Sequence, residues 1–155
     1  MANTQSMCTS FMGELMTATH NFTTGTGNTF KAALFFASAT LNAGTTAYST
    51  TGEVTNTSGT GYTAGGVTIT NGTSPTATNS STTAGVAYWT PTANFQWTAL
   101  TVTTAFDCVL VYNSSSSNKA VSVHTFGSQT ITAGTFTLTM PSNTTSTALL
   151  RLSTT

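Results

Sequence analysis

The sequence predicts a mainly β protein, an antiparallel β-sandwich or jelly-roll-like domain with one N-terminal amphipathic helix. From Phe106 to Leu152, apolar residues alternate with threonine and other small residues, between turns rich in Gly, Pro, Asn and Ser. Threonine favours strands, and hydroxyl-bearing and amide residues take the place of charged ones, which make up 4% of the chain. A chain of 155 residues suffices for one core, and we expect residues 1–155 to form a single domain.

The N-terminal part of the chain predicts a polar leader followed by a helix. Residues 1–8 form the leader, which gives no reason of its own to be ordered. Residues 9–21 predict an amphipathic helix that covers a sheet face, with Glu14 near its positive end. Gly13 weakens this helix by about 1 kcal/mol relative to alanine. The apolar stripe of the helix consists of Phe11, Leu15, Ala18 and Phe22.

The next segments predict a buried strand and then a surface excursion. The apolar run 30–37 is short and flanked by breakers, so we expect a central strand buried on both faces, with Lys31 near its start. We expect a short strand at 52–56 and another at 67–70. The glycines of 61–66 resemble a phosphate loop only superficially, because no lysine and no helix follow them. A turn or bulge that leads into a strand is the better interpretation.

The middle of the chain predicts a loop and two more strands. Residues 71–85 are of low complexity and indicate a loop that is solvent-facing or ordered by a partner. Strands are expected at 86–89 and 94–103, with a bulge around Thr98-Ala99, where the apolar register shifts by one residue. Both tryptophans, Trp89 and Trp97, are expected to pack in the core.

The C-terminal third predicts a meander of short strands. Its alternating apolar residues place strands at 106–112, 121–123 and 136–140. Its connections are a polar segment at 113–118, a tight turn at Ala133-Gly134 and a break at 141–143.

Charge and hydropathy exclude several classes of protein. Three basic residues cannot form a nucleic-acid interface, because phosphate binding needs several on one face. The longest apolar runs, 31–39 and 109–112, fall short of the roughly 20 residues of a membrane span. The first ten residues lack the basic and apolar regions of a signal peptide, so Cys8 and Cys108 are expected to be free thiols.

No catalytic, metal-binding or cofactor-binding residues are predicted. The acidic residues Glu14, Glu53 and Asp107 stand far apart in the sequence. His20, at the end of the predicted helix, suits the negative helix end and so a structural role, and Lys31 suits a strand end.

His124 lies inside a predicted strand, on the face opposite Val121 and Val123. With Cys8, Cys108 and His20 it shows no metal-ligand spacing. Cys108 and His124 could meet across neighbouring strands as a nucleophile pair. However, the apolar neighbours of Cys108 would raise the pKa of its thiol and leave it inert. We therefore expect no enzyme and no cofactor.

Four segments carry a resemblance to a known group of proteins. They are CTSFMGELMTATHNF at the start, TFKAALFFASATLNAGTTAYSTTGEV, GTGYTAGGVTIT, and VLVYNSSSSNKAVSVHTFGSQTITAGTFTLTMPSNTTSTALLRLS at the end. The chain resembles small virion structural proteins of tailed bacteriophages over nearly its whole length, in overall texture and not in a catalytic motif. The resemblance implies a particle protein and leaves open whether it decorates the capsid, joins head to tail or belongs to the tail.

The leading functional expectation is a capsid cement or decoration protein that stabilises a shell by non-covalent contacts. Net charge near zero and few Lys or Pro residues to guard strand edges favour a homo-oligomer packed against other chains. The expected partner is the major capsid protein or another virion protein, and the expected location is the virion, assembled in the host cytoplasm. The leader 1–8 and the loop 71–85 are the expected contact segments.

Two alternatives stay open. One is a tail, adaptor or fibre component, in which strands pair between subunits in rings. The other is a carbohydrate-binding module on the virion, which would need exposed aromatic rings. Its candidates are Tyr48, Tyr62, Tyr88, Trp89 and Trp97.

Overall fold

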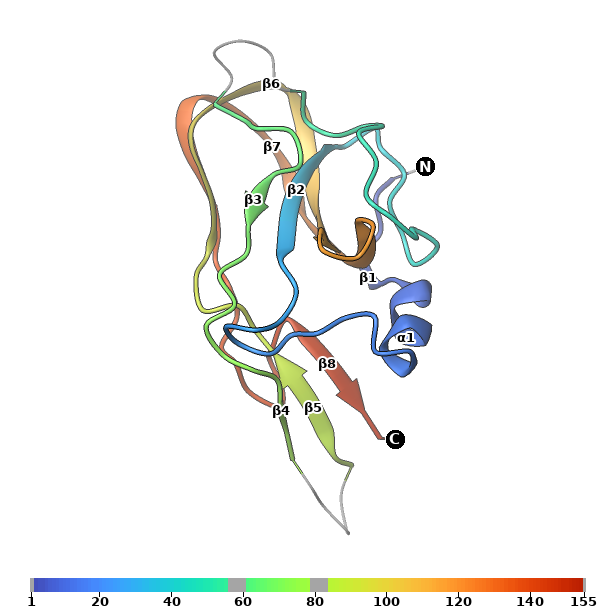
Figure 1. Cartoon of the computed structure of the whole chain (residues 1–155). Helices are drawn as coiled ribbons and strands as arrows, with labels where there is room; N and C mark the ends of the chain where they lie inside the picture. The colour runs from blue at the N-terminus through green and yellow to red at the C-terminus, as the bar shows by residue number, and fades with distance from the viewer. Residues whose placement is uncertain (1, 56–60, 79–83, 155) are drawn as a thin grey trace.

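A computed structural model describes residues 2–55, 61–78 and 84–154, which form two antiparallel sheets and one helix (Figure 1). The larger sheet has the order β1-β7-β6-β2-β3 and the smaller one β4-β5-β8. The mainly β, sandwich-like class with one N-terminal helix is confirmed. The elements are β1 (Ser6–Met7), α1 (Thr9–Met16), β2 (Phe30–Phe36), β3 (Val67–Thr68), β4 (Thr76–Ala77), β5 (Val86–Trp89), β6 (Phe95–Asn113), β7 (Lys119–Leu138) and β8 (Leu150–Ser153).

A long hairpin of β6 and β7 is folded over on itself. The ring centroids of Phe126 and Phe136 on β7 are 5.0 Å apart. Ten residues of straight strand would span about 33 Å, so β7 must double back between them. Figure 1 shows β6 and β7 bending together near the top of the view. The register of the pair shifts repeatedly between Trp97 and Phe106, which marks the bend and gives the molecule two layers.

The core lies around β2, the central strand of the larger sheet. β2 pairs with β6 on one side and β3 on the other. Ala33 and Leu34, whose side chains alternate across the sheet, are both fully buried, and Lys31 is half-buried near the start. The central strand expected at 30–37 is thereby confirmed. Trp89 and Trp97 are also buried, as predicted.

Helix α1 ends at Met16, five residues earlier than predicted. Thr17 caps the helix, its hydroxyl donates to the Glu14 carbonyl at 3.1 Å, and Ala18 takes a left-handed φ of 55°. A threonine side chain that competes for a backbone acceptor in this way weakens a helix end. His20 therefore lies beyond the helix and not at its last turn.

The leader is ordered by the chain itself, so the expectation of a leader without internal support is wrong. β1 pairs with the first part of β7, with Ser6 opposite Val123. The buried Asn3 side chain donates to Asp107 at 2.7 Å and to the Phe36 carbonyl at 3.0 Å. The leader therefore forms part of the larger sheet and its support.

The described part of the 71–85 loop is likewise ordered by the chain. It contains β4, which pairs with β5. Residues 79–83 lie outside the described residues. The expected strand at 52–56 is reduced to a single bridge between Glu53 and Phe35, and residue 56 also falls outside the described part.

The strands predicted at 94–103 and 106–112 form one continuous strand, β6. The tight turn predicted at Ala133-Gly134 is wrong. β6 spans 19 residues and contains the expected bulge, with a left-handed φ of 52° at Ala99. No tight turn forms at Ala133-Gly134, and Ala133 takes a left-handed φ of 49° within the continuous β7. A turn-forming dipeptide thus serves as an irregularity in a bent strand. The polar connection at 113–118 does form the turn between β6 and β7.

The glycine segment 61–66 forms a turn that leads into β3, as predicted. Gly66 has φ +73°, and a Cβ there would collide with the Ala32 carbonyl of β2. Only glycine allows this close approach. Among the described residues, no helix is long and apolar enough to cross a membrane.

Candidate interaction surface

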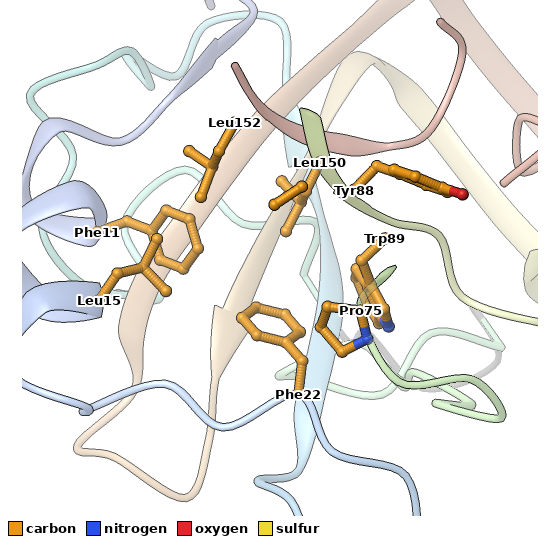
Figure 2. Close-up of a pocket in the computed structure, with 9 residues that line it drawn as sticks. Phe11, Leu15, Phe22, Pro75, Tyr88, Trp89, Leu150 and Leu152 are labelled. Atoms are coloured by element: carbon orange, nitrogen blue, oxygen red, sulfur yellow. The ribbon is translucent and has the colours of Figure 1, made fainter. Parts of the chain in front are cut away.

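An apolar hollow lies between α1 and the smaller sheet (Figure 2). Its volume is about 130 Å³, and its lining side chains are apolar apart from the hydroxyl of Tyr88 and the indole N–H of Trp89. Figure 2 shows Phe11 and Leu15 of α1 on one side and Leu150 and Leu152 of β8 facing them. The lining residues are Phe11, Leu15, Phe22, Pro75, Ala87, Tyr88, Trp89, Leu150 and Leu152.

The sheet side of the hollow follows from strand register. Ala87 of β5 is opposite Leu152 of β8, and Trp89 is opposite Leu150. Residues that are paired directly across two strands share a face, and residues two apart along a strand do too. All four side chains therefore project toward α1. Arg151, between the two leucines, belongs to the opposite face.

The floor of the hollow is held in place by Trp89. Its indole N–H donates to the Asn71 side-chain oxygen and to the Thr73 carbonyl, each at 3.0 Å. The Asn71 amide in turn donates to the Phe22 carbonyl at 2.7 Å. The Phe22 ring stacks on Phe30, with centroids 4.1 Å apart. These links connect the floor of the hollow to β2 of the larger sheet.

The exposed large hydrophobic side chains of the described residues all belong to the two elements that flank the hollow. They are Met12, at 48% exposure, Met16, at 86%, and Leu152, at 42%. The two methionines belong to α1 and the leucine to β8, the two elements that flank the hollow. Scattered exposed hydrophobics are ordinary, but an apolar depression whose lining includes an exposed leucine is typical of a protein-binding surface.

A buried carboxylate supports the larger sheet. Glu53 is 4% exposed and accepts hydrogen bonds from the hydroxyls of Tyr48, at 2.6 Å, and Tyr62, at 2.7 Å. The Gly65 amide donates to it at 2.7 Å, and Tyr112 donates to the Gly65 carbonyl at 2.8 Å. Burial and the nearby Glu53 charge raise the pKa of all three tyrosines, that of Tyr112 to about 12. The phenols stay protonated, so this network is structural.

A second cluster ties α1 to the β6–β7 turn. Glu14 contacts Lys119 at 2.5 Å and His20 at 2.8 Å. The Asn113 amide donates to His20 Nδ1 at 3.1 Å, so Nε2 carries the proton that His20 shares with Glu14. Burial works to raise the pKa of Glu14, but the hydrogen bonds from Lys119 and His20 outweigh it and leave the pKa below its usual value.

The two cysteines are buried free thiols. Burial raises the pKa of Cys8 to about 11 and that of Cys108 to about 12, with smaller contributions from Glu14 and Asp107. Cys108 is opposite Thr125 in the register, so His124 projects from the other face and the nucleophile pair is not formed. The inert character expected for Cys108 agrees with its raised pKa.

His124 finds a different partner, which the sequence analysis missed. Its Nε2 lies 2.8 Å from the Ser122 hydroxyl, two residues back on the same face of β7. Burial lowers the pKa of His124 to about 4, so it is neutral near pH 7. Ser122 is 2% exposed, which keeps its hydroxyl from a substrate. The spacing Ser-x-His within a strand was the available signal.

The other charged groups do not converge on a reactive centre. Asp107 is bound by Asn3. Within the described part of the chain, no three His, Cys, Asp or Glu side chains lie together as a metal site. Comparison of the chain with protein-family models, with curated proteins and with solved structures finds no match. The surface around the hollow is therefore the strongest candidate for a functional site.

Proposed function

We propose that this chain is a structural component of an assembly that acts by packing against other protein surfaces. In its most specific form, it is a cement or decoration protein of a tailed-bacteriophage capsid. The observation that carries the general proposal is a hollow lined by apolar side chains, one of which, Leu152, is 42% exposed, with the exposed Met12 and Met16 on the neighbouring α1. The capsid setting is supported by the sequence resemblance alone.

The composition of the surface suits repeated weak contacts. With 4% charged residues, little charge has to be desolvated when the chain packs against a partner. Many contacts of modest affinity, repeated by symmetry, stabilise a shell by mass action. A tail, adaptor or fibre component would use the same surface, so this alternative is retained and is distinguished by copy number.

Most of the aromatic rings that a carbohydrate-binding module would need are buried or held by other side chains. Tyr62, Trp89 and Trp97 are at most 3% exposed. Tyr48 is stacked on Tyr112, with centroids 4.5 Å apart, and its hydroxyl is bound to Glu53. Among the five candidate rings, Tyr88 alone remains half-exposed without such a role. One ring does not make a sugar platform, so we do not favour this function.

The test is the copy number of the protein in purified phage particles, measured by quantitative mass spectrometry against the major capsid protein. A cement protein is expected at a fixed ratio set by the capsid symmetry, whereas a tail component is expected in far fewer copies. Leu152→Glu should lower occupancy, and Thr103→Glu, at an exposed position on β6, should leave it unchanged. Absence from the particles would contradict the capsid proposal.

A further inference from the structure

The smaller sheet ends at β8, which presents unpaired backbone groups to the solvent. Thr154 N donates to Gly85 O at 3.0 Å, and Thr78 N donates to Val86 O at 3.0 Å. Backbone groups of an antiparallel strand alternate in direction. Because Thr154 N–H points toward β5, the backbone N–H and C=O groups of Leu152 and Leu150, two and four residues earlier, also point toward β5. The N–H and C=O groups of Arg151 and Ser153 point away from the sheet.

This edge is open to another strand. Arg151, Leu152 and Ser153 are all exposed. Figure 1 shows β8 running away from the larger sheet toward the C terminus. β8 contains no proline, and its single charged side chain, Arg151, lies on the face opposite the hollow. β8 is short, but on the side of the hollow it has no proline, charged side chain or bulge to prevent pairing.

We propose that a second copy of this chain pairs its β8 with β8 of the first copy, antiparallel about a two-fold axis at Leu152. This proposal rests on the proposed function and names the partner of the surface. Arg151 of each copy would face Ser153 of the other as a hydrogen-bonded pair. The two Leu152 side chains would meet at the non-hydrogen-bonded position, where opposite side chains are closest.

Charge selects this register. Centring the axis on Arg151 would place two like charges directly opposite each other, which is destabilising. A two-fold axis at Leu152 places each Arg151 opposite the neutral Ser153 of the other copy and brings the two exposed Leu152 side chains into contact. The hollow of one copy then continues into that of the other, because Leu150 and Leu152 of both copies share one face.

The long β7 strand is a poorer site for such pairing. Its register with β6 shifts at several points, and the strand is bent back on itself. Bulges and bends of this kind hinder the addition of another strand. The four residues of β8 have a regular register with β5 throughout. β8 is therefore the edge that a second copy fits.

The test is disulfide cross-linking of the full chain in solution. Leu152→Cys should form a covalent dimer under mild oxidation, because a non-hydrogen-bonded pair has a Cα separation of about 4.5 Å, within the range of disulfides. Arg151→Cys and Ser153→Cys should each cross-link roughly tenfold less on their own and should cross-link with each other when mixed. The native Cys8 and Cys108 are buried and do not interfere.

A proline provides the matched control. Adding Ser153→Pro to Leu152→Cys removes an outward N–H and should abolish cross-linking, whereas adding Ser153→Ala should not. Circular dichroism checks that each variant is folded. If Leu152→Cys cross-links no more than Arg151→Cys, or if the proline has no effect in a folded variant, the β8 pairing is wrong.

The outcomes separate this inference from the proposed function. A chain that does not cross-link through residue 152 but is abundant in particles would refute the β8 pairing and leave the capsid role standing. A chain that cross-links as expected but is absent from particles would refute the capsid role and leave the pairing standing.

Discussion

The larger and smaller sheets differ in the length and exposure of their edge strands. The larger sheet ends in β1 and β3, which are two residues each. The smaller sheet ends in β8, whose last three residues are exposed beside the hollow. The larger sheet contains most of the core, and under our proposal the exposed end of the smaller sheet is the part that would contact another chain.

The same contrast appears in the use of charge. Glu53 and Glu14 both support the larger sheet, the first through neutral donors and the second through Lys119 and His20. The smaller sheet has one charged residue, Arg151, on the face away from the hollow. The few charges of this chain are thus used mainly for internal support.

The largest expected effect is at Glu53. Glu53→Ala leaves two tyrosine hydroxyls and the Gly65 amide without their acceptor, so we expect a loss of about 3–5 kcal/mol in the free energy of unfolding. Tyr48→Phe removes one of these donors and should cost about 1 kcal/mol. Urea denaturation measures both. A loss below about 1 kcal/mol for Glu53→Ala would show that the network does not hold the larger sheet.

Two glycines should respond to alanine with opposite signs. Gly66→Ala places a Cβ against the Ala32 carbonyl at a positive φ, so we expect a loss of about 2–4 kcal/mol. Gly13 lies in α1 with open space around it, so Gly13→Ala should stabilise by about 0.5–1 kcal/mol. Thermal denaturation of the two variants gives the comparison. Equal effects would contradict the close approach of the glycine turn to β2.

Acid should weaken the fold through His124. Its folded pKa of about 4 lies below the ordinary 6.5, so the unfolded chain takes up a proton first as the pH falls. Stability is full above pH 6.5 and decreases toward pH 4, by about 1–2 kcal/mol for this half-buried side chain. The measurement is denaturant unfolding at several pH values. His124→Gln should flatten the slope between pH 6.5 and 5, and an unchanged slope would assign it to another group.

The sequence predicts local structure where periodicity is strong. The run at Phe30–Phe36 indicates a buried central strand because its apolar residues occupy both faces. Ala133-Gly134 is a turn signal by composition, yet in the structure Phe126 and Phe136 pack together across a bent strand. That bend depends on contacts that local propensity does not encode.

Most of the candidate surface could not be predicted from the sequence. The hollow combines Phe11, Phe22, Trp89 and Leu150, which lie far apart in the chain and meet only through the arrangement of the two sheets. The Glu53 network likewise needs Tyr62 and the Gly65 amide, which the glycine turn brings to it. Composition predicts a surface suited to contacts, because a chain with few charges has few charged side chains to protect its strand edges, and this stays a prediction.

Sedimentation equilibrium of the full chain over a range of concentrations tests the central claim most directly. The wild-type mass should rise from 15.9 kDa toward twice that value, and Leu152→Glu should remain at 15.9 kDa with its stability changed by less than about 1 kcal/mol. Thr103→Glu, with the same added charge on β6, should associate as the wild type does. A wild-type chain that stays at 15.9 kDa at every concentration would contradict the claim that the smaller sheet is built for contact with a second copy.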